Sequence, residues 1–157
     1  MLFRSDGEME RLLAKEKLSE MKVRDRIAAA VLTRLEILKA HKDAVRRATA
    51  FLMLPMNAAL GARLLYRMVD AMWRAVGDTS TDFNFYTKRA ILAGVYSTTL
   101  MRWFNDASED GGATRDFLSA RIENVMQFEK FKTGIRERTK DLPSFADVLK
   151  RFSASRS

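Results

Sequence analysis

Hydrophobic residues recur along this chain at the three- and four-residue spacing that is typical of α-helices. The longest predicted helix, Phe83–Asn105, follows a polar turn at Gly77–Thr81, and Thr81 or Asp82 is its expected N-cap. Its large apolar residues are mixed with small ones, which permits close helix packing but equally leaves space for an apolar ligand. Gly94 costs about 1 kcal/mol relative to alanine inside a helix, and it is tolerable if it lets another helix approach closely.

Four helices are predicted before this one, over Glu8–Met21, Lys22–His41, Ala44–Met53 and Ala58–Val76. Asp43 and Asn57 are the expected N-caps of the last two. Pro55 separates these two helices, because the residue before a proline avoids helical angles. The side chains expected to point inward are Val23, Ile27, Val31, Leu35, Leu38, Val45, Ala48, Phe51, Leu52, Leu60, Leu64, Leu65, Met68, Val69, Met72 and Trp73.

Two of these helices carry further information. In the helix over Lys22–His41, arginines such as Arg34 fall mostly off the apolar stripe, which favours a solvated basic face over a phosphate-binding one. The apolar stripe of Ala58–Val76 is wider than one neighbouring helix needs. We therefore expect this helix to be buried or to line a cavity.

The chain after the longest helix is more polar. The acidic loop Asp106–Gly112 lacks the ligand spacing of an EF-hand, so we interpret it as a solvated turn. Thr114 is the expected N-cap of a further helix, Arg115–Phe131. The segment Lys130–Lys140, which Gly134 interrupts, is expected to be a basic linker.

A short amphipathic helix is predicted after Pro143, where Ser144 and Asp147 are spaced like a capping box. Its apolar residues follow at i, i+3, i+4 and i+7: Phe145, Val148, Leu149 and Phe152. Because the helix follows a basic linker, its apolar face needs a partner. That partner is its own domain, a dimer mate or a membrane interface, where apolar anchors and cations act together.

No strand with convincing alternation, internal repeat or low-complexity tract is evident, so the sequence predicts an all-α protein with about seven helices. The length of 157 residues suits one domain with one core. We expect residues 1–132 to form the helical domain, and residues 133–157 to form the basic linker and the amphipathic C-terminal helix.

Composition excludes several kinds of site. The chain has no cysteine and one histidine, His41 at a helix end, which excludes disulfides, thiolate sites and multi-histidine metal sites. The net charge of +8, from 28 Lys and Arg against 20 Asp and Glu, favours an anionic partner, either nucleic acid or a membrane surface. No apolar run approaches the roughly 18 residues of a membrane span. The first residues lack the apolar core of a signal peptide, so we expect neither a secretory signal nor a transit peptide.

Three carboxylates, Asp70, Asp78 and Asp82, are close in sequence and can meet in space, where paired acids perform acid–base chemistry. Each of them has a simpler role at a helix end. The sequence contains no phosphate loop, dinucleotide fingerprint or nucleophile elbow. We therefore expect no catalytic residue, no cofactor and no metal.

Five segments of the chain match the pattern of one family. They are Phe51–Asn57 (FLMLPMN), Val69–Trp73 (VDAMW), Gly77–Ala90 (GDTSTDFNFYTKRA), Val95–Thr99 (VYSTT) and Phe117–Ile122 (FLSARI). The third is long, ordered and unusual. Over Arg24–Phe131 the chain resembles the coenzyme Q biosynthesis accessory family, the ninth of the Coq proteins.

The resemblance implies a fold similar to that of the TetR transcriptional regulators, without gene regulation and without a nucleic-acid partner. Members of the family bind isoprenoid lipids in an internal apolar pocket and present quinone precursors to the membrane-bound di-iron hydroxylase that acts late in ubiquinone synthesis. They are usually homodimers, and a C-terminal amphipathic helix helps them to reach the membrane surface. The resemblance thus implies a non-enzymatic protein that is cytoplasmic and peripheral on the inner membrane in bacteria, or on the matrix side in mitochondria.

The helix patterns supply the candidate lipid-binding residues and membrane anchors, and the resemblance supplies the candidate partner-binding residues. The expected lipid-binding residues are Leu52, Leu60, Leu64, Met68, Met72, Leu92, Val95, Leu100, Trp103 and Phe104. The expected partner-binding residues are Asp70, Trp73, Asp82, Phe85, Tyr86 and Arg89, with Phe85 standing where the family usually has Trp. The expected membrane anchors are the four apolar residues of the final helix.

The family normally begins with a section of three helices similar to a helix-turn-helix, and this chain opens where that section would be ending. We expect the section to be missing, in a shortened piece of such a protein or in a shortened relative. Three other functions remain open: a TetR-like regulator that binds DNA and a small ligand, an enzyme that acts on the quinone itself, and a scaffold with a filled core.

Overall fold

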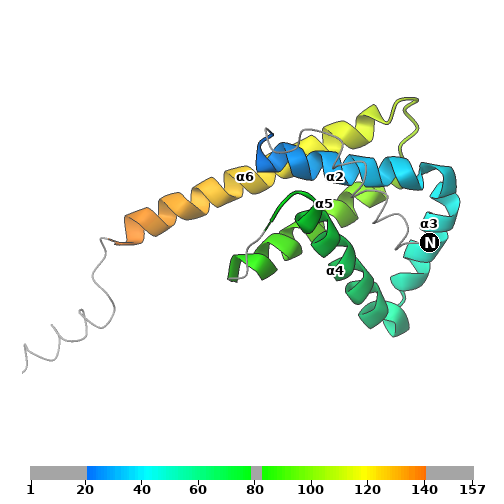
Figure 1. The fold of residues 1–157 in the computed structure, drawn as a ribbon, viewed down its shortest axis with the longest axis horizontal. Coiled ribbons are helices and arrows are strands. Elements are labelled where there is room, and N and C mark those ends of the chain that lie inside the picture. Colours follow the sequence, from blue (N-terminus) through cyan, green and yellow to red (C-terminus); the bar gives the residue numbers. More distant parts are fainter. Residues whose placement is uncertain (1–20, 79–82, 141–157) are drawn as a thin grey trace, which may run out of the picture. The chain divides into compact units, whose positions relative to one another are not determined.

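The computed structural model describes residues 21–78 and 83–140, which form five α-helices and two 3₁₀ turns (Figure 1). In chain order they are α2 (Val23–Leu38), η2 (Lys39–His41), α3 (Lys42–Leu52), η3 (Pro55–Asn57), α4 (Ala58–Ala75), α5 (Phe83–Phe104) and α6 (Gly112–Lys140). These residues include no strand, so the predicted all-α class is confirmed. The predicted first helix, apart from Met21, and the predicted final helix lie outside the described residues. Within the described ranges no individual helix is long and apolar enough to cross a bilayer. One pair of segments, Val23–Leu52 and Pro55–Ala75, has the length and composition of a membrane span only when the two are taken together, and the chain bends by 91° between them.

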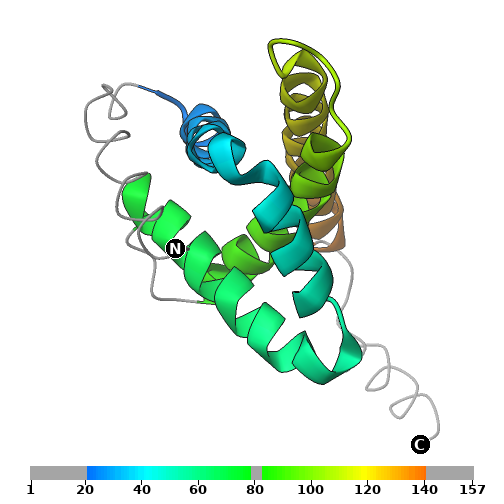
Figure 2. The same cartoon turned by 90° about the vertical axis from the view of Figure 1, so that its right-hand side faces the viewer.

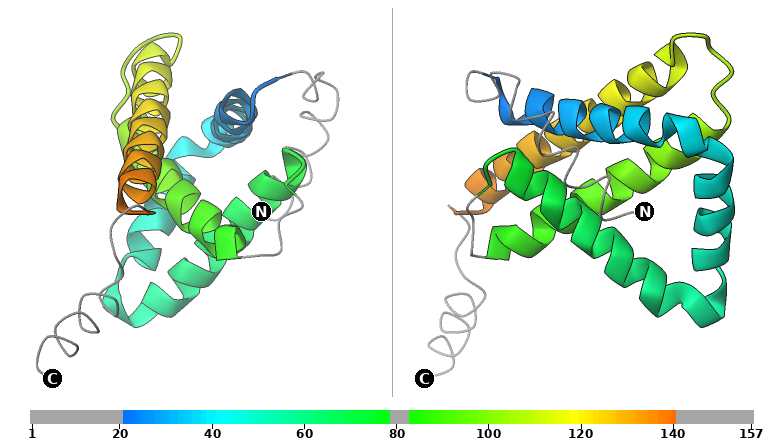
Figure 3. Two further views of the ribbon diagram at one scale, coloured as in Figure 1. Left: turned by 90° about the vertical axis from the view of Figure 1, so that its left-hand side faces the viewer. Right: turned by 45° about the vertical axis from the view of Figure 1, so that its right-hand side comes forward.

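The chain divides into two compact units, Met1–Ile122 and Glu123–Ser157, and the boundary lies within α6. In the first unit α4 contacts α2, α3 and α5, and α2 also contacts α5. Figures 2 and 3 show the chain running along α2, turning into α3 and turning again into α4. The apolar core of this unit contains Ile27, Ala30, Val31, Leu35, Leu38, Met68, Val69, Met72, Trp73, Val76, Leu92, Val95, Tyr96, Leu100, Trp103, Phe104 and Leu118.

The described part of the second unit is the continuation of α6 to Lys140. The prediction of a linker over Lys130–Lys140 is therefore wrong. The lysine, glutamate and arginine residues of this segment are good helix formers, so Gly134 does not end the helix. This part of α6 exposes three large apolar side chains: Phe128, Phe131 and Ile135.

Two residues predicted to be N-caps, Asp43 and Asn57, do not cap their helices in the structure. His41 is the residue before α3, so Asp43 lies inside the first turn, where its charge suits the positive end of the helix dipole. Asn57 does precede α4, but it makes no cap hydrogen bond. Its Nδ2 instead donates to the carbonyl oxygen of Phe51 at 2.9 Å, which ties the end of α3 to the start of α4.

Asp106 performs the capping role predicted for Thr114, because α6 begins two residues before Thr114. The backbone amide of Thr114 donates to Asp106 Oδ2 at 2.8 Å. Ser108 donates to Asp106 Oδ1 through its hydroxyl and, at 2.9 Å, through its backbone amide. These bonds, that of the Ser108 hydroxyl foremost, hold the pKa of Asp106 well below its usual range because they stabilise the carboxylate.

Several predicted orientations are also wrong. Arg34 is fully buried instead of lying on a solvated face, because it stands three residues after Val31 and four before Leu38, within the apolar stripe. Among the described residues, no atom beyond the local helix backbone lies within 4 Å of a Cβ added at Gly94, so no helix approaches closely there. Four side chains that were expected to point inward are exposed: Val23, Ala48, Phe51 and Leu60.

Candidate functional site

A pocket of about 530 Å³ lies between α2, α3, α4 and α5, in the first compact unit. This volume is within the range of roughly 300–1,000 Å³ that is usual for small-molecule sites. Most of the lining is apolar, as in such sites. The lining residues are Arg34, Leu38, Val45, Thr49, Leu52, Met53, Ala58, Gly61, Ala62, Leu64, Leu65, Arg67, Met68, Tyr96, Ser97, Thr98, Leu100 and Met101.

One side of the pocket is formed by the elbow, the segment Phe51–Leu60 that joins α3 to α4 through η3. The backbone at Leu54 is extended and Pro55 begins the 3₁₀ turn, because the residue before a proline avoids helical angles. Gly61 then allows α4 to pass close to the end of α3. A Cβ added at Gly61 would lie only 2.9 Å from the carbonyl oxygen of Leu52.

The wall that α2 and α5 contribute is more polar. Arg34 Nε donates to the hydroxyl oxygen of Tyr96 at 3.3 Å, and both side chains are buried. Ser97 and Thr98 add hydroxyl groups to the same stretch of α5. An apolar cavity with a few convergent polar groups suits an amphipathic ligand that carries oxygen atoms at one end.

The residues that the sequence proposed for lipid binding fall into three groups. Four of them line the pocket: Leu52, Leu64, Met68 and Leu100. Leu60 is exposed on the elbow. The others are buried in the core and do not belong to the lining: Met72, Leu92, Val95, Trp103 and Phe104.

Sequence reasoning overlooked the polar lining residues. Arg34 and Tyr96 each carry a signal, since both stand on apolar stripes of their helices, Arg34 beside Val31 and Tyr96 beside Leu92 and Leu100. Small lining residues such as Gly61 and Ala62 carry no comparable signal. Their place at the pocket depends on how closely α3 and α4 approach each other.

A second feature, which we call the clasp, is a chain of ion pairs between the end of α4 and the start of α5: Arg74, Asp70, Arg89, Asp78 and Lys88. Arg89 is its centre, with Nε donating to Asp70 Oδ1 at 2.7 Å and Nη1 lying 3.5 Å from Asp78 Oδ2. Arg74 Nη2 pairs with Asp70 at 2.8 Å, and Lys88 Nζ pairs with Asp78 at 2.9 Å. The Arg89 side chain is 3 % exposed, so removing one partner would leave a poorly solvated charge.

Aromatic side chains surround the clasp. The guanidinium carbon of Arg89 lies 3.3 Å from the ring centroid of Phe85, and Arg89 Nη1 donates to the Phe85 carbonyl oxygen at 3.1 Å. Tyr86 packs edge-on against Phe85, with ring centroids 5.2 Å apart, and is 66 % exposed. Trp73 is buried, and its Nε1 donates to the carbonyl oxygen of Lys88 at 3.1 Å.

The clasp accounts for the described residues that were predicted to bind a partner. Asp70, Trp73 and Arg89 are engaged inside the unit, and they hold Phe85 and Tyr86 in place. The remaining predicted residue, Asp82, lies outside the described residues.

The predicted meeting of carboxylates also occurs in the clasp. Asp70 and Asp78 come together on Arg89, a shared cation, in an ion-pair arrangement that holds α4 to α5. Within residues 21–78 and 83–140 no group of three or more His, Cys, Asp or Glu is placed to hold a metal ion. The ion pairs of the clasp join α4 to α5, and Tyr86 is exposed beside them.

Comparison with known proteins covers much of both features. Residues 58–129 match the COQ9 family model. The match confirms the family resemblance seen in the sequence. It includes the whole clasp and the part of the pocket from Ala58 to Met101, whereas the pocket residues of α2 and α3 precede it.

Curated relatives carry the COQ9 name. The chain is 46 % identical over 97 residues to the ubiquinone biosynthesis protein COQ9, mitochondrial, of Rattus norvegicus, which is 62 % of this chain and 31 % of the rat protein. It is 44 % identical over 113 residues to the protein of the same name from Bos taurus, which is 72 % of this chain and 34 % of the relative. With the human protein it shares 45 % over 97 residues, 62 % of this chain and 30 % of the relative. The chain thus spans about a third of the length of the curated relatives that it matches.

Proposed function

We propose that this chain is the lipid-binding part of an accessory protein of ubiquinone biosynthesis. It binds an isoprenoid lipid or quinone precursor in the pocket and presents it to the membrane-bound di-iron hydroxylase, without catalysing a reaction itself. The observation that carries the proposal is an apolar pocket of about 530 Å³ lined in large part by a segment that matches the COQ9 family. The names of the relatives place them in the same biosynthetic route.

The lining suits such a ligand. An isoprenoid tail gains roughly 25 cal/mol for each Å² that leaves water. A bilayer already shelters that tail, so a pocket must offer an equally apolar wall for the transfer to be near balance. Leucine, methionine and alanine side chains from α3 and α4 supply this wall, and Arg34 with Tyr96 offers hydrogen bonds to the oxygen atoms of an aromatic head.

The surface above the clasp suits the hand-over to a partner. Tyr86 presents an exposed aromatic ring with a hydroxyl, which is a frequent anchor at protein interfaces. Arg89 fixes the ring of Phe85 beneath it, so the patch is held in place before the partner arrives. Because Phe85 lacks the indole N–H that the family usually has here, the contact relies more on Tyr86.

The relatives are named as mitochondrial, and we place this protein peripherally on the inner membrane, on the matrix side in a eukaryote or the cytoplasmic side in a bacterium. A homodimer, a TetR-like fold and a final membrane helix remain predictions. The four anchors of that helix, Phe145, Val148, Leu149 and Phe152, lie outside the described residues.

Lipid content tests the pocket. Organic extraction of the purified chain followed by mass spectrometry should release a prenylated lipid. Ala62→Phe places a ring in the pocket and should abolish that recovery, whereas Ala59→Phe, exposed on the same helix but absent from the lining, should retain it. A lipid-free parent protein, or equal lipid in both variants, would contradict the proposal.

Hydroxylase capture tests the clasp surface. Tyr86→Asp should weaken binding of the di-iron hydroxylase at least tenfold, on the order of a single hot-spot residue, and should leave the lipid content unchanged. Tyr66→Asp is a matched control, since Tyr66 is an exposed tyrosine of α4 outside the pocket lining. Equal losses in both variants, or no loss in either, would rule out this surface as the contact.

A further inference from the structure

The elbow exposes an unusual concentration of large apolar side chains. Five of them occur within ten residues, with exposed fractions that range from 44 % for Leu54 to 85 % for Met56: Phe51, Met53, Leu54, Met56 and Leu60. Single exposed apolar residues are ordinary, but a contiguous group marks a surface that meets a protein or a membrane. The elbow contains the most exposed of these side chains among the described residues.

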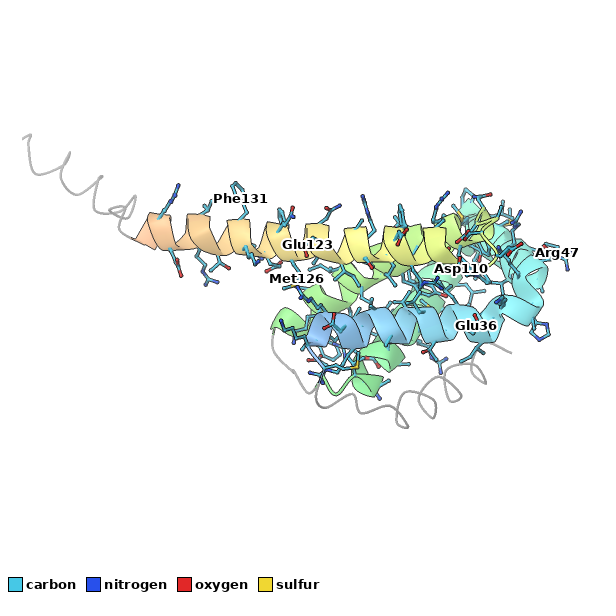
Figure 4. The ribbon with its side chains drawn as sticks, turned by 90° about the horizontal axis from the view of Figure 1, so that it is seen from above. Glu36, Arg47, Asp110, Glu123, Met126 and Phe131 are labelled. Carbon is cyan, nitrogen blue, oxygen red and sulfur yellow. The ribbon has the colours of Figure 1, made fainter. Side chains whose placement is uncertain are left out.

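The charge around the elbow has one sign. Between Asp43 and Asp70 the sequence contains no acidic residue and four arginines: Arg46, Arg47, Arg63 and Arg67. Two precede the apolar group on α3 and two follow it on α4, one to two helical turns away. Figure 4 shows Arg47 projecting outward from α3.

The elbow is supported from behind. Asn57 bonds the end of α3 at Phe51, and Gly61 brings α4 against Leu52. At the start of α3, Lys42 Nζ donates to the Asp106 carbonyl oxygen at 3.3 Å and lies 5.1 Å from the Trp103 ring centroid. The corner where α3 meets α4 (Figure 3) is therefore presented by a supported backbone.

We propose that the elbow docks on an anionic bilayer, with its apolar tip in the acyl region and with Arg47 and Arg63 at the level of the phosphates. Apolar anchors and cations are the two components of interfacial membrane binding, and each is weak without the other. Each Lys or Arg near an anionic surface contributes roughly fivefold to partitioning. A protein partner of acidic character would satisfy the arginines but would not need five apolar side chains on so short a turn.

The elbow is a different segment of the sequence from the predicted C-terminal membrane helix, and its docking does not depend on the ligand of the pocket. If the proposed function holds, however, the two are linked. Leu52, Met53 and Ala58 belong both to the elbow and to the pocket lining. A lipid could then pass from the leaflet into the pocket at the point of docking, without crossing water.

A fluorescent label tests the docking directly. Because the chain has no cysteine, Met56→Cys creates a single site for an environment-sensitive nitrobenzoxadiazole probe, and Phe128→Cys, an exposed apolar position of α6, is the matched control. The full chain is titrated with phosphatidylcholine vesicles that contain or lack phosphatidylglycerol. We expect emission from position 56 to shift to the blue and to be quenched by lipids brominated on their acyl chains, only on the anionic vesicles, while position 128 reports water throughout.

The proposal is overturned if the probe at position 56 stays in water while the protein binds vesicles, if both positions respond alike, or if the protein ignores anionic vesicles. Lipid recovered from the same purified proteins reports on the pocket separately. If the purified protein contains no lipid but the elbow docks on vesicles, only the proposed function is contradicted. If the protein contains lipid but the elbow stays in water, only this inference is contradicted.

Charge-altering variants separate the two components. Leu54→Glu with Met56→Glu should lower partitioning into anionic vesicles more than tenfold, and Arg47→Gln with Arg63→Gln should lower it roughly 25-fold, from about fivefold for each charge. Phe128→Glu should leave it unchanged. Circular dichroism and sedimentation accompany each variant. If the elbow pair instead dissociates a dimer and keeps its vesicle affinity, the elbow binds a second copy of the chain and the proposal is wrong.

Discussion

The two ends of α4 have opposite surroundings. Near the C-terminal end Met72 is fully buried, and Asp70 is held by Arg89 at 2.7 Å. At the N-terminal end Leu60 is exposed and Ala62 lines the pocket. One helix of eighteen residues thus contributes packing at one end and an open apolar surface at the other.

The helix before it repeats this difference in the reverse direction. The start of α3 is fastened to the end of α5, where Arg46 donates to the carbonyl oxygen of Phe104 and Lys42 to that of Asp106. The end of α3 exposes Phe51. The elbow therefore lies between two fastened helix ends, which explains how apolar side chains can remain exposed without collapsing onto the core. In both helices, one end contributes to stability and the end at the elbow offers a surface for binding.

The largest expected effect lies at the clasp. Arg89→Ala should lower the free energy of unfolding by about 3–5 kcal/mol, because it leaves Asp70 and Asp78 poorly solvated and without their shared cation. Urea unfolding at neutral pH measures this loss. Lys88→Gln removes a cation whose side chain is 39 % exposed and should cost about 1 kcal/mol or less. Equal costs would mean that the clasp does not hold α4 to α5.

Two substitutions of a large apolar side chain by alanine compare the two ends of α4 directly. Met72→Ala should cost about 2–5 kcal/mol, since it removes a fully buried side chain and leaves a cavity. Leu60 is exposed on the elbow, so Leu60→Ala should change the free energy of unfolding by about 0.5 kcal/mol or less. Thermal melts of both variants supply the comparison. A large loss for Leu60→Ala would show that the elbow contributes to the core after all.

Two glycines sharpen the distinction between a close approach and open space. Gly61→Ala should destabilise the protein by about 1–3 kcal/mol, because its Cβ would stand 2.9 Å from a backbone oxygen at Leu52. Gly94→Ala should stabilise it by about 0.4–1 kcal/mol, since that position is helical and unobstructed. Chemical denaturation measures both signs, and effects of the same sign would contradict this description of the elbow.

A further prediction concerns the loop that receives Lys42. Asp106→Ala should cost about 1 kcal/mol at neutral pH, the usual value of a lost helix cap. Asp110→Ala, in the same loop but exposed, should cost less.

The pH dependence of that cap has a definite sign. Folding lowers the pKa of Asp106, so its ionised form is the stabilising one. The contribution is complete above the unfolded pKa of about 3.9 and is lost as the pH falls below that value. The stability difference between the parent protein and Asp106→Ala should therefore shrink in acid. A difference that grew below pH of about 4 would contradict the capping role.

Much of the architecture was predictable because helix periodicity is a local property. The stripes of α2 and α4 correctly placed Ile27, Val31, Met68 and Val69 in the core, and the all-α class followed from them. Helix starts were less predictable. Whether Asp106 or Thr114 caps α6 depends on how the loop folds back, which local pattern does not express.

The candidate site was predictable only in part. Leu60 and Leu64 are the same residue type on the same predicted stripe, yet one is exposed and the other lines the pocket. Arg34 counted as a solvent-exposed cation until the packing of α2 against α5 placed it beside Tyr96. The close approach that was considered for Gly94 occurs instead at Gly61, where no sequence signal predicted it.

The sequence by itself determined approximately where α2, α3, α4 and α5 lie, the all-α class and the resemblance to the COQ9 family, because each depends on residue order over short distances. Only the tertiary structure decided which apolar residues line the pocket, which ones are exposed on the elbow and which charged residues pair in the clasp. The physical reason is that a helical stripe defines a direction, whereas burial depends on whether a neighbouring helix is present in that direction. Among the described residues, no helix covers the elbow, and there the chain keeps both its pocket and its exposed apolar surface.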